Sequence, residues 1–249
     1  MENNLKNRES ILVAGNGRIL YSISACLLRA GHLVVLFTED TDGAIKRIQM
    51  HYKDLSGLAH KSINPHSLEV TNRLNNNIPY QLVIAVTGEN IEEKRNLIHL
   101  IEKKAPNDAI IAINTESIPL SALQEGCNYP GRIIGANWAE PAHTTFFLEL
   151  IINKIADRKY ADRLFYLAKN YWNKDPYLVL NDTGIRARMF AAMMREALYL
   201  VKNEYASVED IDRACRNDAG YYLPFAGNCR YMDLMGTYAY GMVMQELNP

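Results

Sequence analysis

The sequence predicts an α/β fold with a mostly parallel sheet, followed by an all-α region. Three observations indicate this fold. An apolar run ends in Gly-Asn-Gly at residues 15–17, further short apolar runs alternate with helical patterns up to about residue 135, and the pattern is mainly helical from about residue 183. We therefore expect two domains, residues 1–182 and residues 183–249.

Residues 11–39 predict the unit around which the first domain is built. The apolar run 11–14 is typical of a buried strand, and the glycine turn that follows it leads into a helical pattern. Gly31 ends that pattern, and a second apolar run, 33–37, comes next. This order of strand, glycine turn, helix and strand is that of the first βαβ unit of a Rossmann-type dinucleotide-binding domain.

Each part of the glycine turn suits a dinucleotide phosphate group. Gly15 permits the tight turn out of the strand, and Gly17 lets a pyrophosphate approach the backbone because no Cβ stands in the way. The helix that begins at Arg18 and Ile19 points unpaired N–H groups and a partial positive charge at that phosphate. These four residues are therefore expected to bind the cofactor.

The end of the second strand and one departure from the glycine motif refine this expectation. Thr38 or Glu39 can hydrogen-bond a ribose hydroxyl, and an acid there favours NAD over NADP. The third glycine of the usual motif is replaced by Leu20, which we expect to push the helix outward or to shift the cofactor. A structural turn without a nucleotide is the alternative interpretation.

The remaining elements follow in order along the chain. Strands are expected at 82–86, 109–113, 132–136, 146–152 and 177–180. Helices are expected at 42–55, from an Asn90 cap through 101, at 158–172, and from 182 onward. Residues 56–79 are polar and are expected to hold a short helix and a loop.

Composition narrows the class of protein. A hydrophobic content of 48% and a charged content of 22% are ordinary for a soluble globular chain. The net charge of −1 gives no attraction to nucleic acid or to an anionic membrane. No apolar run is long enough for a membrane helix, and the polar N-terminus does not resemble a signal peptide. The four cysteines are scattered, so we expect a cytoplasmic protein with no metal site.

Several stretches, taken in order, resemble one family. They are residues 13–17, 30–36, 89–94, 114–117, 130–135, 148–151, 182–185 and 206–212. Together they are similar to the L-3-hydroxyacyl-CoA dehydrogenases, which oxidise the 3-hydroxyl group of acyl-CoA with NAD. The resemblance covers nearly the whole chain, and it implies NAD as cofactor. The short helical region leaves apolar faces that need a partner, so we also expect a homodimer formed through the C-terminal helices.

The resemblance also implies roles for individual residues. Glu89 and Lys94 would lie along the cofactor. Asn114 follows a strand at the edge where α/β folds place ligands, and it is a further cofactor-binding residue by this resemblance. Glu149 would be the carboxylate that orients a catalytic imidazole, which takes the hydroxyl proton as hydride leaves for nicotinamide.

The chain departs from the family in the active site itself. Asn137 stands where the family has its catalytic histidine, although the spacing of twelve residues to Glu149 is kept. An amide has no useful pKa and cannot take a proton. Two further polar positions have become Glu116 and Glu140, and Arg188 is expected to pair with one of them.

Two functions stay open on this evidence. The first is an NAD-dependent oxidoreductase whose substrate is either acyl-CoA or another small molecule, such as a cationic or amine-bearing one. Its catalytic residues would be Glu149, Asn137, Glu116 and Arg188. The second is a non-catalytic relative that kept the nucleotide fold and lost the chemistry. His143 is either a displaced base or an ordinary loop histidine.

Overall fold

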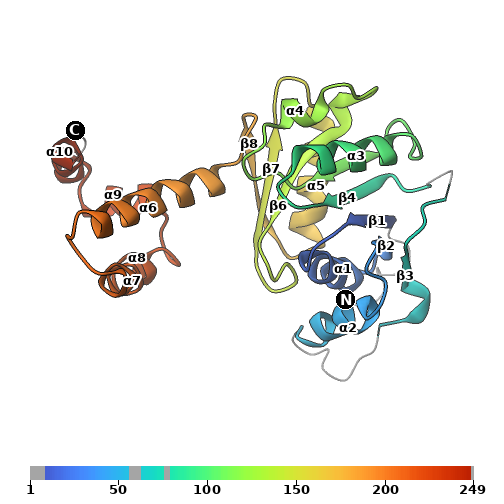
Figure 1. Ribbon diagram of the computed structural model, residues 1–249, viewed down its shortest axis with the longest axis horizontal. Helices are drawn as coiled ribbons and strands as arrows, with labels where there is room; N and C mark the ends of the chain where they lie inside the picture. The colour runs from blue at the N-terminus through green and yellow to red at the C-terminus, as the bar shows by residue number, and fades with distance from the viewer. Residues whose placement is uncertain (1–8, 56–62, 76–78, 248–249) are drawn as a thin grey trace. The chain divides into compact units, whose positions relative to one another are not determined.

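The computed structural model describes residues 9–55, 63–75 and 79–247. The chain divides into two compact units, residues 1–188 and residues 189–249 (Figure 1). The domain boundary expected at residues 182–183 remains a prediction, and it lies just before the first helix of the C-terminal region.

The first unit is built on one eight-stranded sheet. Its strands are β1 (Ser10–Gly15), β2 (Leu33–Phe37), β3 (Leu68–Thr71), β4 (Leu82–Val86), β5 (Ile110–Ile113), β6 (Ile133–Trp138), β7 (Phe147–Ile152) and β8 (Asp175–Leu180). They lie in the order β3-β2-β1-β4-β5-β6-β7-β8. The first six are parallel, β7 is antiparallel to β6, and β8 is parallel to β7. The mostly parallel sheet predicted from the sequence is confirmed, with the Rossmann strand order in its first six strands.

Helices cover both faces of this sheet. They are α1 (Ile19–Arg29), α2 (Ala44–Lys53), α3 (Ile91–Glu102), α4 (Leu120–Gln124) and α5 (Arg158–Asn170), with short 3-10 turns at Pro65–Ser67 and Pro130–Arg132. Side chains of α1, α2 and α5 pack into one apolar cluster, and those of α3 and α4 pack into the other. The central strands β4 and β5 are buried throughout, which explains their unbroken apolar sequences.

Two details differ from the sequence prediction. Residues 68–71 form the edge strand β3 rather than a loop, because a short, half-buried strand pairing on one side needs no apolar run. Strand β6 runs to Trp138, so Asn137 lies inside a strand and not after it. The Leu20 side chain is 1% exposed and belongs to the core cluster that also contains side chains of β1, and the outward shift of α1 expected from it stays a prediction. Residues 56–62 and 76–78, from the segment expected to hold a short helix and a loop, lie outside the described residues.

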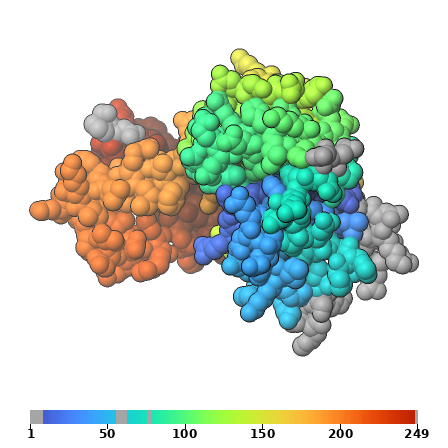
Figure 2. All heavy atoms as spheres, turned by 45° about the vertical axis from the view of Figure 1, so that its right-hand side comes forward, coloured from blue at the N-terminus to red at the C-terminus, as the bar shows by residue number. Residues whose placement is uncertain are grey.

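The C-terminal region is helical, as expected. Its helices are α6 (Ile185–Lys202), α7 (Val208–Asn217), α8 (Ala219–Tyr222), α9 (Asn228–Met235) and α10 (Thr237–Leu247). Ser207 caps α7 by accepting a hydrogen bond from the Asp210 backbone N–H. None of the described residues in these five helices is buried, and their side chains stand at the surface (Figure 2, orange to red). Among the described residues, no helix combines the length and apolar character required to cross a membrane.

Candidate active site and cofactor groove

The cofactor groove opens where the strand order reverses, between β1 and β4. Gly15 ends β1 with a φ of +126°, and a Cβ at this position would lie 1.8 Å from the Val86 carbonyl oxygen of β4. The Asn16 N–H donates a hydrogen bond to that same carbonyl at 2.9 Å. Only glycine can therefore turn the chain here, at the point where open α/β sheets bind their ligands.

A cavity of about 450 Å³ occupies this groove. It is lined on one side by Gly15, Asn16, Thr38 and Glu39, and on the other by Thr87 and the first turns of α3. Among the described residues, neither Leu20 nor Arg18 takes part in this lining. The cavity joins the glycine turn to the tip of β2, which is the path that an adenosine diphosphate would follow.

The glycine turn itself leaves room for a phosphate group. Gly17 has a φ of +97°, and a Cβ built on it would meet no atom within 4 Å. Arg18 and Ile19 begin α1, and the Arg18 guanidinium is exposed, 3.7 Å from the Glu140 carboxylate. The residues present therefore fit a dinucleotide, with the α1 N-terminus facing its pyrophosphate.

The tip of β2 carries a second acid that the sequence analysis did not single out. Thr38 is buried and Glu39 is exposed, both at the edge of the cavity. Asp40, one residue further on, accepts a hydrogen bond from the Tyr21 hydroxyl at 2.8 Å and pairs with Arg47 of α2. These hydrogen bonds hold the pKa of Asp40 below its usual value. Asp40 is thus already engaged, and Glu39 is the acid left facing the cavity.

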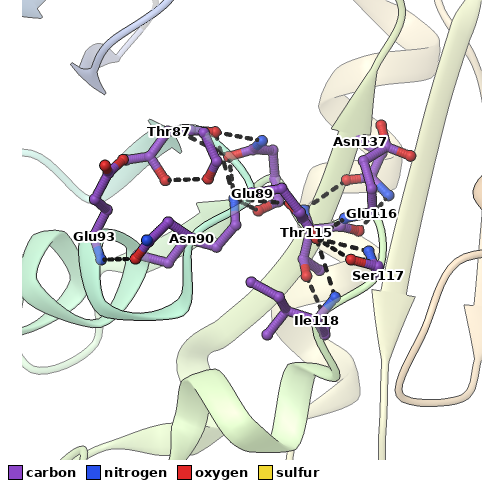
Figure 3. Close-up of polar contacts among 12 residues, drawn as sticks. Thr87, Glu89, Asn90, Glu93, Thr115, Glu116, Ser117, Ile118 and Asn137 are labelled. Atoms are coloured by element: carbon purple, nitrogen blue, oxygen red, sulfur yellow. Dashed lines mark hydrogen bonds and ion pairs between the residues drawn. The ribbon is translucent and has the colours of Figure 1, made fainter.

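Polar side chains tie the ends of β4 and β5 together beside the groove (Figure 3). The buried Lys94 ammonium donates to the Asn114 carbonyl at 2.8 Å and to its side-chain oxygen at 3.1 Å. The Asn114 amide in turn exchanges hydrogen bonds with the backbone of Thr87. Glu89 Oε1 accepts from the backbone N–H groups of residues 116, 117 and 118, at 2.7 to 3.0 Å. Glu89, Lys94 and Asn114 thus form one hydrogen-bonded network that joins the ends of β4 and β5 beside the groove.

The surroundings of Lys94 and Glu89 change the pKa of each of these two side chains. Burial lowers the pKa of Lys94, although the Glu89 carboxylate 3.4 Å away opposes that effect. Burial alone would raise the pKa of Glu89, but the backbone N–H groups of Ser117 and Ile118 and the charge of Lys94 outweigh it and lower the pKa. Glu89 is therefore held as the anion, and its role here is to hold the turn after β5.

Asn137 and Glu149 face each other across the antiparallel strands β6 and β7. They are register partners, and Asn137 Nδ2 donates to Glu149 Oε1 at 3.0 Å. The same nitrogen donates to the Thr115 carbonyl at 2.7 Å, while Asn137 Oδ1 accepts from the Thr115 N–H at 2.8 Å. Both donor hydrogens of the amide are therefore used, and Asn137 is only 1% exposed. The pair occupies the positions of the family's histidine and carboxylate, but the Asn137 amide cannot take a proton as an imidazole can.

The other oxygen of Glu149 is held by the chain that begins α6. Glu149 Oε2 accepts from the Ile185 N–H at 2.8 Å, the Arg186 N–H at 3.2 Å and the Tyr177 hydroxyl at 3.0 Å. A Cβ on Gly184 would lie 2.1 Å from Glu149 Oε1, so glycine is required at this approach. A fully buried carboxylate with four donors is stabilised by the helix N-terminus as well.

The arginine that pairs with Glu116 is Arg186, not Arg188. Arg186 Nη1 lies 2.7 Å from Glu116 Oε1, and Glu140 pairs instead with Arg18. Arg188 is exposed two residues further along α6. The expectation that Arg188 pairs with one of the new carboxylates is therefore corrected: on a helix, residues two apart point to nearly opposite sides, and only Arg186 reaches β5.

Glu116 is a titratable group next to the Asn137–Glu149 pair that remains accessible. Its side chain is 36% exposed at the C-terminal end of β5, beside the Asn137–Glu149 pair. Burial raises the pKa of Glu116; the nearby Arg186 charge lowers it, and the Glu149 and Glu89 carboxylates raise it further. The net pKa is above the usual value. A partly exposed carboxylate of raised pKa that follows a parallel strand, at the edge where α/β sheets bind ligands, is a candidate for proton transfer.

His143 lies in a different environment. It follows β6 in the loop before β7, and its ring faces His51 and Asp54 at the end of α2. The contacts of Asn137 and Glu149 are with Thr115, Tyr177 and the start of α6. The structure does not bring His143 into that network.

The fold and the groove define a dinucleotide-dependent oxidoreductase of the Rossmann type. The chain belongs to the 3-hydroxyacyl-CoA dehydrogenase family: residues 10–183 match the 3-hydroxyacyl-CoA dehydrogenase NAD-binding domain, and residues 185–248 match the 3-hydroxyacyl-CoA dehydrogenase C-terminal domain. The cofactor is NAD, and the class of activity is NAD-dependent oxidoreduction, as the sequence predicted.

Two curated relatives illustrate the range of the family. The chain is 26% identical over 248 residues to 5-formyl-3-hydroxy-2-methylpyridine 4-carboxylate 5-dehydrogenase of Mesorhizobium japonicum, covering 96% of this chain and 80% of that protein. It is 25% identical over 221 residues to 3-hydroxybutyryl-CoA dehydrogenase of Clostridioides difficile, covering 85% of this chain and 78% of that protein. Relatives of one family thus act on both a pyridine carboxylate and an acyl-CoA.

Solved structures show the same fold. The structure of 5-formyl-3-hydroxy-2-methylpyridine 4-carboxylic acid 5-dehydrogenase, described as an NAD⁺-dependent dismutase, superimposes with a TM-score of 0.88 at 24% identity, covering 97% of this chain and 81% of that one. The 3-hydroxyacyl-CoA dehydrogenase of Archaeoglobus fulgidus gives a TM-score of 0.80 at 20% identity, covering 97% and 82%.

Proposed function

We propose that the protein oxidises a hydroxyl group of a small molecule with NAD, and that Glu116 takes the hydroxyl proton. The observation that carries this proposal is the position of Glu116, which is accessible, has a raised pKa and lies beside the Asn137–Glu149 pair. Bound NAD would accept the hydride from the substrate carbon. The O–H proton passes to a Glu116 carboxylate oxygen, so one C–H and one O–H bond break and a carbonyl forms.

In this proposal Asn137 and Glu149 are positioning residues. The Asn137 amide holds Thr115 by two hydrogen bonds, and Thr115 is the residue directly before Glu116. Glu149 holds Asn137 on one side and the first turn of α6, which carries Arg186, on the other. The pair therefore fixes both partners of the Glu116–Arg186 contact.

Arg186 suggests the kind of substrate. Its guanidinium donates to Glu116 from one nitrogen, lies 5.3 Å above the Phe147 ring and is 44% exposed. Its remaining donors are of the type that binds a carboxylate in a bidentate manner. We propose that the substrate is a small hydroxy compound or hydrated aldehyde that carries a carboxylate, with acyl-CoA as the alternative.

The experiment compares Glu116→Gln with a matched control. Oxidation of small hydroxy acids and aromatic aldehydes, and reduction of acetoacetyl-CoA, are followed by NADH absorbance. Glu116→Gln should lose at least tenfold in kcat and keep its affinity for NADH. Glu125→Gln removes another carboxylate that pairs with an arginine, Arg95, and should change neither quantity. Equal rates for both variants would exclude Glu116 as the base, and saturable NADH binding without any turnover would favour a non-catalytic relative.

We also propose a homodimer formed through the C-terminal helices. Large apolar side chains of this region are exposed, with Phe225 at 83%, Leu234 at 72% and Leu247 at 75%. A unit of about sixty residues with so much apolar surface gains stability when a second copy covers it. Light scattering of the purified protein should give twice the chain mass of 28.3 kDa. If the protein has the mass of a single chain at all concentrations tested, the dimer is contradicted.

A cytoplasmic location is the third part of the proposal. All four cysteines are free thiols, and Cys215 and Cys229 are exposed. Exposed thiols persist in a reducing compartment and become oxidised outside it. Fractionation of the native cells, followed by immunoblotting, should place the protein with the cytoplasmic markers.

A further inference from the structure

A buried histidine without a hydrogen-bond partner marks a second site in the first unit. His143 is 4% exposed, and neither of its ring nitrogens makes a hydrogen bond to any described residue. The polar atom facing it is Asp54 Oδ2, 3.5 Å from His143 Nε2. A buried imidazole that makes no hydrogen bond is costly, so such a group calls for a ligand.

Two side chains from α2 converge on this imidazole. His51 lies in the last turn of α2 and Asp54 is its C-cap, so the two are three residues apart and share one side of the helix. The His51 and His143 rings are 4.7 Å apart between centroids. One ligand atom from each of the three residues lies within 4.8 Å of the other two.

We propose that His51, Asp54 and His143 bind a zinc ion. Two imidazoles and one carboxylate are a zinc ligand set that leaves a fourth position for water. In a tetrahedral site with bonds of about 2.1 Å, neighbouring ligand atoms are about 3.4 Å apart. Asp54 and His143 already have this spacing, and His51, which is half-buried on the helix surface, closes the site by a side-chain movement.

The charges around the cluster act in opposite directions on a cation. Burial lowers the pKa of His143; the neighbouring His51 lowers it further, and Asp54 opposes both. The nearby Lys174 charge acts against a cation, but its ammonium donates to the carbonyls of Ala142 and Thr145. Asp54 supplies the single negative charge of the site.

The other histidine–acid cluster of the described chain is already occupied by protein groups. It consists of His99, Glu102 and Cys127. Glu102 accepts hydrogen bonds from the backbone N–H groups of residues 128 and 129 and lies 3.8 Å from the Arg132 guanidinium. A cation there would have to displace these donors, whereas at His143 it would displace none.

Zinc at the proposed site would join α2 to the loop between β6 and β7. That loop is already held by other contacts, among them the hydrogen bond from the Ala142 N–H to Ser22 Oγ of α1 at 3.0 Å. It also carries Glu140, which pairs with Arg18 at the glycine turn. The ion would therefore be a structural tie behind the cofactor groove, independent of the chemistry proposed for Glu116.

The test measures zinc binding by the full chain. Protein stripped with a chelator is titrated with ZnCl₂ by calorimetry, and with CoCl₂ by visible absorption. We expect one ion per chain at this site, and Asp54→Asn and His51→Ala should each weaken it at least tenfold. Both residues are at least partly exposed, so the variants should fold, which circular dichroism checks. His99→Ala and His66→Ala are the controls and should leave binding unchanged.

Three results would overturn the proposal. They are no binding by the wild-type chain, binding unchanged in Asp54→Asn and His51→Ala, and an equal loss in His99→Ala. Because the readout is binding of the metal alone, a failure here is distinguishable from a failure of the proposed oxidoreductase mechanism.

Discussion

Arg186 Nη1 lies 2.7 Å from Glu116 Oε1, and this contact joins the first turn of α6 to the end of β5. The backbone N–H of the same arginine donates to Glu149. One residue therefore touches both carboxylates of the candidate site, once with its side chain and once with its main chain. The place of residues 185–186 and the protonation of Glu116 are linked through it.

Arg186→Ala should shift the pH dependence of oxidation. The Arg186 charge lowers the pKa of Glu116, so its removal raises that pKa further above the usual value. The base form is then reached at higher pH, and the rising limb of the kcat profile should move upward. Arg188→Ala is the matched control, since Arg188 is exposed on the same helix, and its profile should coincide with the wild type. A shift in the control alone would restore Arg188 as the partner of the site.

Asn137→His should raise turnover in the Glu116→Gln background, where Asn137 no longer has a base to position. An imidazole at this position faces Glu149 across the strand pair, as the amide does now at 3.0 Å, and it can accept a proton. We expect at least a tenfold increase in kcat near neutral pH, measured by NADH absorbance. Glu149→Ala should lower turnover in both the wild-type and the Asn137→His backgrounds. Unchanged rates in all three variants would mean that the chemistry does not depend on this pair.

Alanine substitutions at Gly15 and Gly17 should affect different properties, the stability of the fold in the first case and mainly the affinity for NADH in the second. Gly15→Ala places a Cβ 1.8 Å from the Val86 carbonyl and should destabilise the fold by about 4 kcal/mol or more in urea unfolding. Gly17→Ala meets no atom within 4 Å, and its positive φ should cost only about 1–2 kcal/mol. It should nevertheless weaken NADH binding. Gly126→Ala, with a φ of +77° and equally open space, should show the same strain and normal NADH affinity.

Two Arg–Glu pairs of different burial should differ in their contribution to stability. Glu102 and Arg132 are both buried, and Glu102→Gln leaves the guanidinium without its counter-charge. We expect a loss of about 3 kcal/mol in the free energy of unfolding. Glu125→Gln breaks the exposed pair with Arg95 and should cost about 0–1 kcal/mol. Similar losses for the two variants, measured by urea unfolding, would contradict this view of the buried pair.

The sheet was predictable because most of its strands carry their own signal. Strands β4 and β5 are buried on both faces, so their sequences are unbroken apolar runs. Asn90 was predicted as the cap of α3, and it does accept hydrogen bonds from the N–H groups of the first turn. Strand β3 was missed because its residues are only partly covered, and its pairing with β2 is a long-range property.

The sequence predicted where the candidate site lies in the fold, but it did not predict every contact between the side chains of that site. The facing of Asn137 and Glu149 followed from their spacing and from the family resemblance. Which arginine meets Glu116 did not, because Arg186 and Arg188 differ only in their direction around a helix whose rotation the sequence does not give. The cluster of His51, Asp54 and His143 joins segments almost ninety residues apart, so no local spacing could indicate it.

The hydrogen bonds that join the ends of β4 and β5 should reduce the entropy lost when the cofactor binds. Lys94, Asn114 and Glu89 already have protein partners, so this wall of the groove is ordered before any nucleotide arrives. Little conformational entropy is then lost when the adenosine enters, and its association rate is not limited by loop closure. Hydrogen exchange at residues 87–90 and 114–118 should accordingly be slow in the free protein and change little on saturation with NADH.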